Sequence, residues 1–165
     1  MTEYSIIDSQ SSHFELDIEQ LRTLLRNQLN EELELFSMPS LLNHLHTSDA
    51  TIDRLIAHWQ QADSIRTWLA LDENKIYLGF VCAQLKPDLF NDKDVVTGEV
   101  VAVYVSETYR KLGIASRLFK SAENWMQTQN AHALNVSWLK GNQASESLYK
   151  KFGVEEIMRS GRKLL

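Results

Sequence analysis

The sequence contains few residues of the kinds that make cross-linked, rigid or membrane-embedded structures. Among its 165 residues there is one cysteine, Cys82, so no disulfide can form within the chain. It has two prolines, Pro39 and Pro87, and no Gly/Ser-rich linker, low-complexity tract or internal repeat. No segment approaches the roughly 20 consecutive apolar residues that a membrane-spanning helix needs. We therefore expect a single domain, residues 1–165, that does not enter a membrane.

Positive charge is also scarce. The chain has 17 Lys and Arg against 22 Asp and Glu, a net charge of -5, whereas a nucleic-acid-binding protein usually carries a basic face. The first ten residues, MTEYSIIDSQ, lack the basic start and apolar core of a secretory signal peptide. The histidines include His44 and His46, but that spacing does not place both on one face of a helix. These features predict a cytoplasmic protein with no metal and no nucleic-acid partner.

Hydrophobic periodicity predicts a mixed α/β domain. Apolar residues with helical spacing follow Asp17, and the same spacing recurs over 49–61, 114–129 and 143–151. Short β-branched or alternating runs predict strands at 4–7, 65–71, 76–85, 99–105 and 134–139. Residues 86–98 are typical of a polar loop, and the last residues, 154–165, could form two short strands around Ser160 and Gly161.

The stretch YVSETYRKLGIAS, residues 104–116, joins a predicted strand to a predicted helix. At such a join the first helical amides lack partners within the helix and carry the positive end of its dipole, which favours an anion. Gly113 lets a phosphate approach the backbone, Arg110 adds a charged donor and Ser116 adds a hydroxyl. The pattern favours a diphosphate site, although it is neither a P-loop nor a dinucleotide fingerprint. The alternative is a plain turn with a basic surface residue.

A second segment, WLKGNQASESLYKKFG at 138–153, favours the phosphate interpretation. Its Asn142 is a good helix N-cap, and Tyr149 follows at the spacing N-x-x-S-x-x-L-Y before a Phe-Gly turn. With R-x-x-G-x-A at 110–115 and Leu-Gly-Phe at 78–80, the segment resembles the signatures of the GNAT family, the GCN-related N-acetyltransferases. The resemblance covers residues 76–155, about half of the chain.

The resemblance implies a fold and a co-substrate. The GNAT acyl-CoA N-acyltransferase fold is a mixed α/β domain with a central seven-stranded mixed sheet, about four flanking helices, and strands 4 and 5 splayed apart. Acetyl-CoA lies in that opening. Carried over to this sequence, 110–116 hold the pyrophosphate, the backbone of Val103 and Val105 pairs with the pantetheine arm, and Asn142 fixes the pantetheine or the helix start. The residues expected to contact the co-substrate are Val103, Tyr104, Val105, Arg110, Lys111, Leu112, Gly113, Ile114, Ala115, Ser116 and Asn142.

The resemblance also implies catalytic residues. Tyr149 would lie near the sulfur, where a phenol with an ordinary pKa of about 10 is protonated at neutral pH and can act as general acid to the leaving thiolate. Glu99 is the candidate base, because strand alternation places it on the side of Val103 and Val105, where it could act directly or through water. The alternatives are a core aromatic and an exposed strand-end glutamate. Cys82, in mid-strand, is expected to be a buried and inert thiol.

Charge suggests the kind of acceptor. Residues 28–63 hold six acids against one base, Arg54, which sums to the chain's net charge of -5. In the family this region borders the acceptor site, and an acidic rim would concentrate a cationic amine such as a polyamine, an aminoglycoside-like molecule or a lysine-containing peptide. The alternative is a solvated helix face.

Together these observations predict an acetyl-CoA-dependent N-acetyltransferase, an enzyme of the acyltransferase class. It would transfer the acetyl group to a primary amine by direct attack in a ternary complex. One alternative is a catalytically silent acyl-CoA-binding regulatory module of the same fold, and another is an unrelated α/β protein in which both motifs are coincidental. The terminal segments could contribute to a homodimer, although nothing in the sequence demands one.

Overall fold

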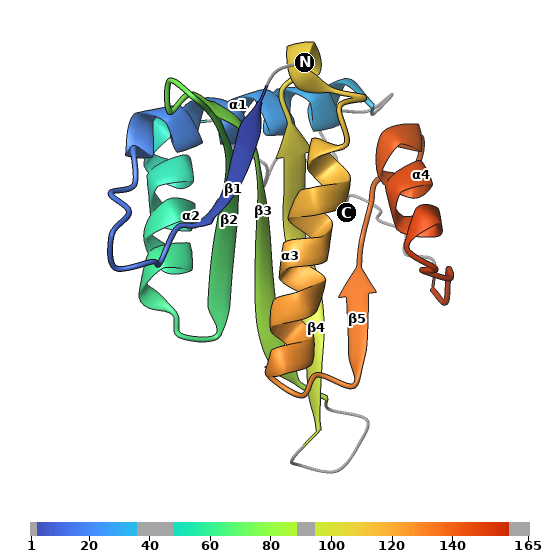
Figure 1. The fold of residues 1–165 in the computed structure, drawn as a ribbon. Coiled ribbons are helices and arrows are strands. Elements are labelled where there is room, and N and C mark those ends of the chain that lie inside the picture. Colours follow the sequence, from blue (N-terminus) through green and yellow to red (C-terminus); the bar gives the residue numbers. More distant parts are fainter. Residues whose placement is uncertain (1–2, 36–47, 89–94, 159–165) are drawn as a thin grey trace.

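The computed structural model describes residues 3–35, 48–88 and 95–158 (Figure 1). Five strands form one sheet in the order β1-β2-β3-β4-β5. The strands are β1 (Tyr4–Asp8), β2 (Ile65–Asp72), β3 (Tyr77–Pro87), β4 (Val96–Val105) and β5 (Ala133–Val136). The first four pair in antiparallel fashion, and β5 runs parallel to β4. The helices are α1 (Ile18–Glu34), α2 (Asp49–Gln61), η2 (Glu107–Tyr109, a 3-10 turn), α3 (Ile114–Thr128) and α4 (Gln143–Lys151).

The mixed α/β architecture with four flanking α-helices is confirmed, and some of the expected boundaries are wrong. Among the described residues there are five strands instead of seven. Residues 154–158 form no strand, and the rest of the expected terminal hairpin lies outside the described residues. The expected loop 86–98 is shorter, because β3 continues to Pro87 and β4 begins at Val96. The strand expected at 134–139 ends at Val136, where its pairing with β4 ends.

Two hydrophobic cores lie on opposite faces of the sheet, under the helices that cover each face in Figure 1. α3 covers one face, where Leu118 and Phe119 are buried with Val81 of β3. α1 and α2 cover the other face, where Leu25 and Ile52 belong to one cluster. Successive strand residues point to opposite faces, so the nearly continuous apolar run of β3 supplies both cores.

The start of α1 and the β2–β3 turn follow directly from local sequence. Asp17 caps α1, and its carboxylate accepts from the backbone N–H of Gln20 at 3.1 Å. Asp72 accepts from the N–H of Asn74 and of Ile76 at 2.9 and 2.8 Å, which closes the predicted turn. Longer-range bonds then hold the start of α1 against the sheet, because the Asp17 N–H donates to the Tyr77 hydroxyl at 2.8 Å and the Tyr77 N–H donates to the Gln20 side chain at 2.9 Å.

The β4–β5 pair positions the site, because it opens partway along. The two strands are paired only from Thr97↔Ala133 to Val100↔Val136. Beyond Val100, β4 continues to Val105 while the chain after Val136 leaves the sheet and leads to α4. This divergence is the expected splay of strands 4 and 5, and it leaves one edge of β4 without a partner strand among the described residues.

Candidate functional site

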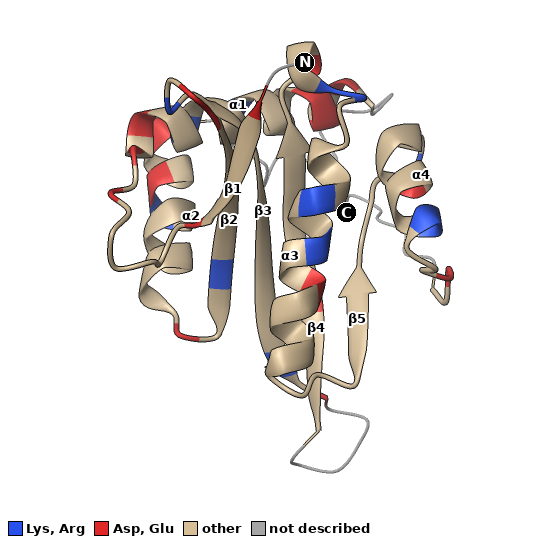
Figure 2. Ribbon diagram, viewed as in Figure 1, with Lys and Arg blue, Asp and Glu red and all other residues tan. Residues whose placement is uncertain are grey.

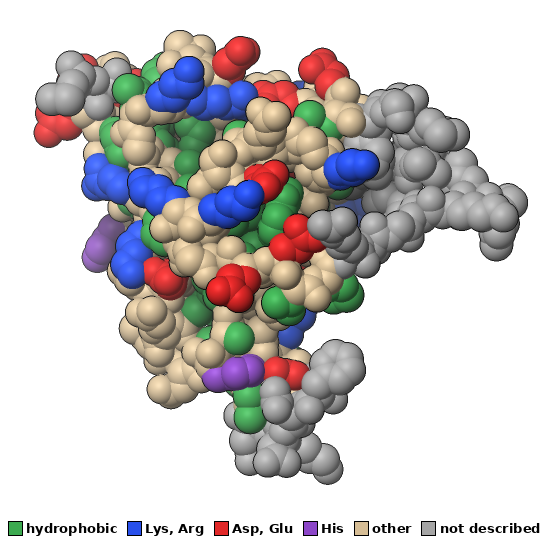
Figure 3. Space-filling model, turned by 90° about the vertical axis from the view of Figure 1, so that its right-hand side faces the viewer, with side chains coloured by type: hydrophobic (Ala, Val, Ile, Leu, Met, Phe, Trp, Pro, Cys, Tyr) green, Lys and Arg blue, Asp and Glu red, His purple; other side chains and the backbone are tan. Residues whose placement is uncertain are grey.

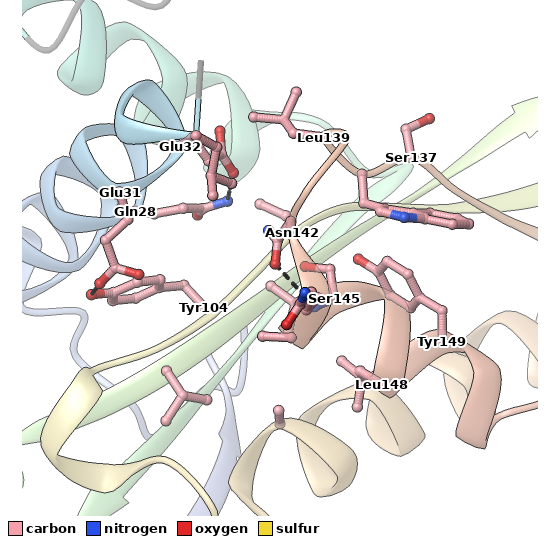
Figure 4. A pocket seen from close by; sticks show the side chains of 18 of the residues that line it. Gln28, Glu31, Glu32, Tyr104, Ser137, Leu139, Asn142, Ser145, Leu148 and Tyr149 are labelled. Carbon is pink, nitrogen blue, oxygen red and sulfur yellow. Dashed lines mark hydrogen bonds between the residues drawn. The ribbon is translucent and has the colours of Figure 1, made fainter. Parts of the chain in front are cut away.

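A cavity of about 530 Å³ begins where β4 and β5 separate (Figure 4). Its walls come from the last turns of α1, the unpaired part of β4, the segment after β5 and the first turns of α4. The residues that line it include Gln28, Glu31, Glu32, Val101, Val103, Tyr104, Val105, Arg110, Ala115, Trp138, Asn142, Ser145, Leu148 and Tyr149. Six of the eleven residues expected to contact the co-substrate, Asn142 among them, thus line one cavity with the expected acid, Tyr149. The other five do not line it: Lys111, Leu112, Gly113, Ile114 and Ser116.

The loop before α3 has the geometry of an anion site. Gly113 is the N-cap of α3 with φ +81°, a left-handed conformation that side chains other than glycine adopt at a cost. The nearest atom to a Cβ added there would be the Tyr4 hydroxyl at 4.0 Å, so the space above Gly113 is open. The first helical bond runs from the Arg117 N–H to the Gly113 carbonyl, which leaves the amides of 114–116 without acceptors inside the helix.

Basic side chains surround that loop. The ammonium of Lys151 donates to the Ser116 hydroxyl at 3.0 Å, and the Arg117 guanidinium stacks on the Tyr4 ring at 4.6 Å. Figure 2 shows further Lys and Arg along α3 and α4, and Figure 3 shows such side chains gathered over the face that carries α4. This charge suits an extended, multiply phosphorylated ligand.

Arg110 turns away from the loop that it was expected to complete. Its Nε donates to the Val105 carbonyl at 3.0 Å, and its Nη2 donates to both carboxylate oxygens of Glu31 at 2.8 and 2.5 Å. The Tyr104 hydroxyl donates to the same carboxylate at 2.7 Å. Burial and this neighbouring acid raise the pKa of Tyr104 to about 12. Arg110 therefore connects the end of β4 to α1.

Tyr149 lies on α4, which begins directly after its N-cap, Asn142. The Asn142 side chain accepts from the Ser145 N–H at 3.0 Å, as a helix N-cap does. Tyr149 is 4% exposed and its ring packs near Phe119 and Trp138, yet it lines the cavity and its hydroxyl points into it (Figure 4). Burial, and secondarily the charge of Glu32, raise the pKa of Tyr149 to about 12, so the phenol is protonated at neutral pH.

The expectation that Glu99 shares a face with Val103 and Val105 is wrong. An irregularity in the pairing with β3 sets Ala102 opposite Cys82 but Val100 opposite Ala83, so Val101 is an extra residue. The alternation of side chains shifts there and places Glu99 on the opposite face. Its carboxylate pairs with Lys86 and accepts from Gln84, and it is not among the residues that line the cavity.

The family resemblance placed region 28–63 beside the acceptor site, but no single residue of α1 was identified from the sequence as lining the cavity. Glu31 and Glu32 entered only as members of an acidic segment, and Gln28 was not considered. Gln28 donates to the Glu32 carboxylate at 2.8 Å, and burial raises the pKa of Glu32 above its ordinary value. A signal was present, because Gln28 and Glu32 continue the helical spacing of the buried Leu21 and Leu25.

The sequence predicts no membrane-spanning segment, no metal site and no reactive cysteine. No helix among the described residues is both long and apolar enough to cross a membrane. Within residues 3–35, 48–88 and 95–158, no three histidine, cysteine or acidic side chains are grouped as metal ligands would be. Cys82 is fully buried, and burial raises the pKa of its thiol to about 12, which does not suit a nucleophile.

Solved structures with the same fold include acetyltransferases and a proposed acetyltransferase. A proposed acetyl transferase from Pyrococcus furiosus matches with a TM-score of 0.75 at 21% identity, covering 99% of this chain and 100% of that one. The aminoglycoside acetyltransferase AAC(6')-Iy, in complex with a bisubstrate analogue of CoA and acetylneamine, matches with a TM-score of 0.69 at 20% identity, covering 99% and 100%. The aminoglycoside 6'-N-acetyltransferase AAC(6')-Ih from Acinetobacter baumannii matches with a TM-score of 0.68 at 15% identity, covering 99% and 98%.

A family model identifies the chain more directly than these distant structures, which at such identities show the fold alone. The model of the acetyltransferase (GNAT) family matches residues 27–154, which include the last turns of α1, the loop before α3 and all of α4. The chain therefore belongs to the acetyltransferase (GNAT) family.

Proposed function

We propose that this protein is an N-acetyltransferase that moves the acetyl group of acetyl-CoA to a primary amine by direct attack in a ternary complex. The observation that supports the proposal is the cavity between β4 and β5, whose lining includes Tyr149 and, beside the Gly113 N-cap of α3, Ala115. A long co-substrate with phosphates at one end and a thioester at the other fits that arrangement.

The chain's own groups would hold acetyl-CoA at three places. The amides of 114–116 and the positive end of the α3 dipole receive the pyrophosphate. The unpaired edge of β4 at Val103 and Val105 pairs with the pantetheine amides, as an added strand would. The Val105 N–H is our candidate for polarising the thioester carbonyl. An N–H donor binds the negative charge that develops on the carbonyl oxygen more tightly than it binds the neutral oxygen.

Proton transfer needs an acid and a base. Tyr149 supplies the acid, since its phenol is protonated and directed into the cavity. Glu99 is the base that the sequence suggests. It lies where β4 and β5 are still paired, outside the cavity lining, so it would have to act through water.

The acceptor would be a cation, either a small polyamine- or aminoglycoside-like molecule or a peptide amine. The last turn of α1 carries acids and no base, and two of these acids line the cavity. Two of the structural neighbours act on aminoglycosides, which are polycationic, and this supports the class without identifying the compound.

The test combines calorimetric titration with acetyl-CoA and an assay of thiol release over spermidine, neamine and a lysine-containing peptide. Micromolar binding with thiol release on one class of amine is expected. Binding without release on any amine would favour the alternative, a catalytically silent acyl-CoA-binding module. If acetyl-CoA does not bind, the loop before α3 is only a turn and the proposal fails.

A further inference from the structure

We propose that Glu32, on the last turn of α1, receives the ammonium group of the acceptor and takes its proton before the amine attacks. This inference rests on the proposed function and assigns its base to a residue that the sequence did not single out. It is carried by the placement of Glu32 in the cavity wall, by its contact with Gln28, and by the difference between Glu32 and its neighbour Glu31 (Figure 4).

The two adjacent glutamates have different partners. Glu31 is bound by the guanidinium of Arg110 and by the Tyr104 hydroxyl, so its charge is already compensated. Glu32 has the amide of Gln28, which is uncharged, as its hydrogen-bond donor. Of the two carboxylates in this wall, Glu32 is therefore the one whose negative charge is available to bind a cationic acceptor.

Gln28 presents an unfilled acceptor beside this carboxylate. Its Nε2 donates to Glu32, while its Oε1 is buried and has no hydrogen-bond partner among the described residues. A buried carbonyl oxygen without a donor destabilises the folded protein, because it has lost its hydrogen bonds to water. An ammonium group has three N–H donors, so it could bind the Glu32 carboxylate and the Gln28 oxygen together.

Both acids also lie at the wrong end of the helix for stability. The last turn of α1 holds Glu31, Glu32 and Glu34 and no basic residue. The negative end of a helix dipole disfavours acids there. The arrangement therefore destabilises the unbound protein. A cation that binds at this end of the helix would relieve the repulsion, so the arrangement favours the binding of an amine in its ammonium form.

Glu32 is better placed than Glu99 for this step. Glu99 is bonded to Lys86 and Gln84 and lies below the opening of the two strands. Glu32 lines the same cavity as Tyr149, and the two are close enough for its charge to affect the phenol. Glu32 would therefore take the proton from the acceptor nitrogen on one wall of the cavity, and Tyr149 would donate a proton to the leaving sulfur from the opposite wall.

The protons balance over the reaction. Glu32 takes one proton from R–NH3⁺ to give R–NH2, whose lone pair forms the new N–C bond to the acetyl carbon. As the C–S bond breaks, the Tyr149 hydroxyl gives its proton to the thiolate, and the phenolate recovers a proton from the newly acylated nitrogen. Glu32 then releases its proton to solvent, so the sum is one amide, one thiol and one H⁺.

Protonation of Glu32 would assist Tyr149. The negative charge of Glu32 is one of the two causes of the raised pKa of Tyr149. When Glu32 accepts the proton, that charge disappears and the phenol becomes a stronger acid at the moment when the thiolate leaves. Within the part of the chain that the structure describes, the titratable and charged groups that line the cavity with Glu32 are Tyr149 on α4, Glu31 on the same helix, and Tyr104 and Arg110 from β4 and its following loop.

The experiment compares Glu32→Gln with Glu99→Gln and with Glu34→Gln, an exposed acid of the same helical turn. Acetyl-CoA affinity is measured by calorimetry, and kcat/KM for spermidine and neamine by thiol release from pH 7 to pH 9. Glu32→Gln should bind acetyl-CoA as the native protein does but lose at least about 100-fold in kcat/KM at pH 7, as loss of a general base does. Glu34→Gln should match the native protein.

The pH profile identifies a base more specifically than the size of the loss. Without Glu32 the enzyme can use only amine that is already deprotonated, so its kcat/KM should rise about tenfold per pH unit, whereas the native profile stays nearly flat. Glu32→Asp, which retains a carboxylate, should restore the flat profile in part even if its rate is low. If the role of Glu32 were purely structural, kcat/KM of Glu32→Gln and of Glu32→Asp would be lowered by the same factor at every pH.

The outcomes separate the two proposals. If the native protein releases thiol and Glu32→Gln does so at a similar rate, or if Glu99→Gln shows the large, pH-dependent loss instead, the role of Glu32 is refuted while the acetyltransferase stands. If the native protein binds acetyl-CoA and releases no thiol with any amine, the proposed function fails and the base fails with it.

Discussion

The two ends of the cavity are built by different means. At the α3 end the groups that we propose for recognition are backbone amides and a left-handed glycine, with basic side chains around them. At the α1 end they are the side chains of Gln28, Glu31 and Glu32, directed inward from a helix whose last turn is acidic. Figure 2 shows the basic residues of α3 and α4. The first end suits a fixed, phosphorylated co-substrate, and the second suits a cation whose identity can change with a few substitutions.

The largest effect is expected where the two ends meet, at Tyr149. Tyr149→Phe removes the hydroxyl and keeps the ring contacts with Phe119 and Trp138. We expect turnover to fall by at least about 100-fold, as loss of a general acid does. Acetyl-CoA affinity, measured by calorimetry, should change by less than about threefold. Equal turnover in the variant would show that another group protonates the thiolate.

The next effect concerns the α3 end alone. Gly113→Asp adds a negative charge at the anion site and forces a side chain into a left-handed conformation that costs about 1–2 kcal/mol. We expect acetyl-CoA to bind at least about tenfold more weakly by calorimetry. Gly153→Asp is the matched control, because Gly153 also has positive φ and open space around it but lies beyond α4. Equal losses in both variants would count against the phosphate cradle.

The substitution Arg110→Ala tests whether a residue bonded at the α1 end of the cavity also contributes to acetyl-CoA binding at the α3 end. The ion pair of Arg110 with Glu31 is partly exposed, with side-chain exposures of 38% and 42%. Exposed pairs contribute only about 0–1 kcal/mol to stability, so Arg110→Ala should stay folded. Because the guanidinium is bonded to Glu31 and Val105 and not directed at the loop before α3, the substitution should weaken acetyl-CoA binding by less than about fivefold. Arg26→Ala, which breaks a comparable pair with Asp49, is the control. A loss as large as that of Gly113→Asp would mean that the guanidinium swings to the phosphates when the co-substrate binds.

The same contrast explains what could be predicted from the sequence. The α3 end depends on short-range features, namely an N-cap, a glycine and a strand-to-helix join, and these were recognisable in the order of residues. The Asn142 cap and the turn at Asp72 were predictable for the same reason. Each is stabilised by bonds within a few residues, so its sequence pattern is local.

The α1 end and the side chain of Glu99 could not be assigned in this way. The face that Glu99 occupies depends on one extra residue at Val101, and that irregularity is a property of the pairing between β3 and β4. Gln28 and Glu32 reach the cavity only because α1 crosses the sheet beside the end of β4. The acidic composition of 28–63 indicated a cationic acceptor, but composition does not tell which carboxylate faces inward.

The smallest expected effect compares the tyrosines of the two walls through alkaline pH. Burial raises the pKa of Tyr149 to about 12, against an ordinary value of about 10, so its neutral form stabilises the folded state. That contribution is complete below pH 10 and is lost as the pH rises toward 12, because the unfolded chain releases its proton first. The difference in unfolding free energy between the native protein and Tyr149→Phe should therefore shrink by up to about 1 kcal/mol between pH 9 and pH 11 in urea titrations. Tyr104→Phe should show the same direction, since Tyr104 has a similarly raised pKa. A difference that stays constant for Tyr149 and shrinks for Tyr104 would mean that the α4 wall is more hydrated than the α1 wall, which would weaken the case for Tyr149 as the protonated acid.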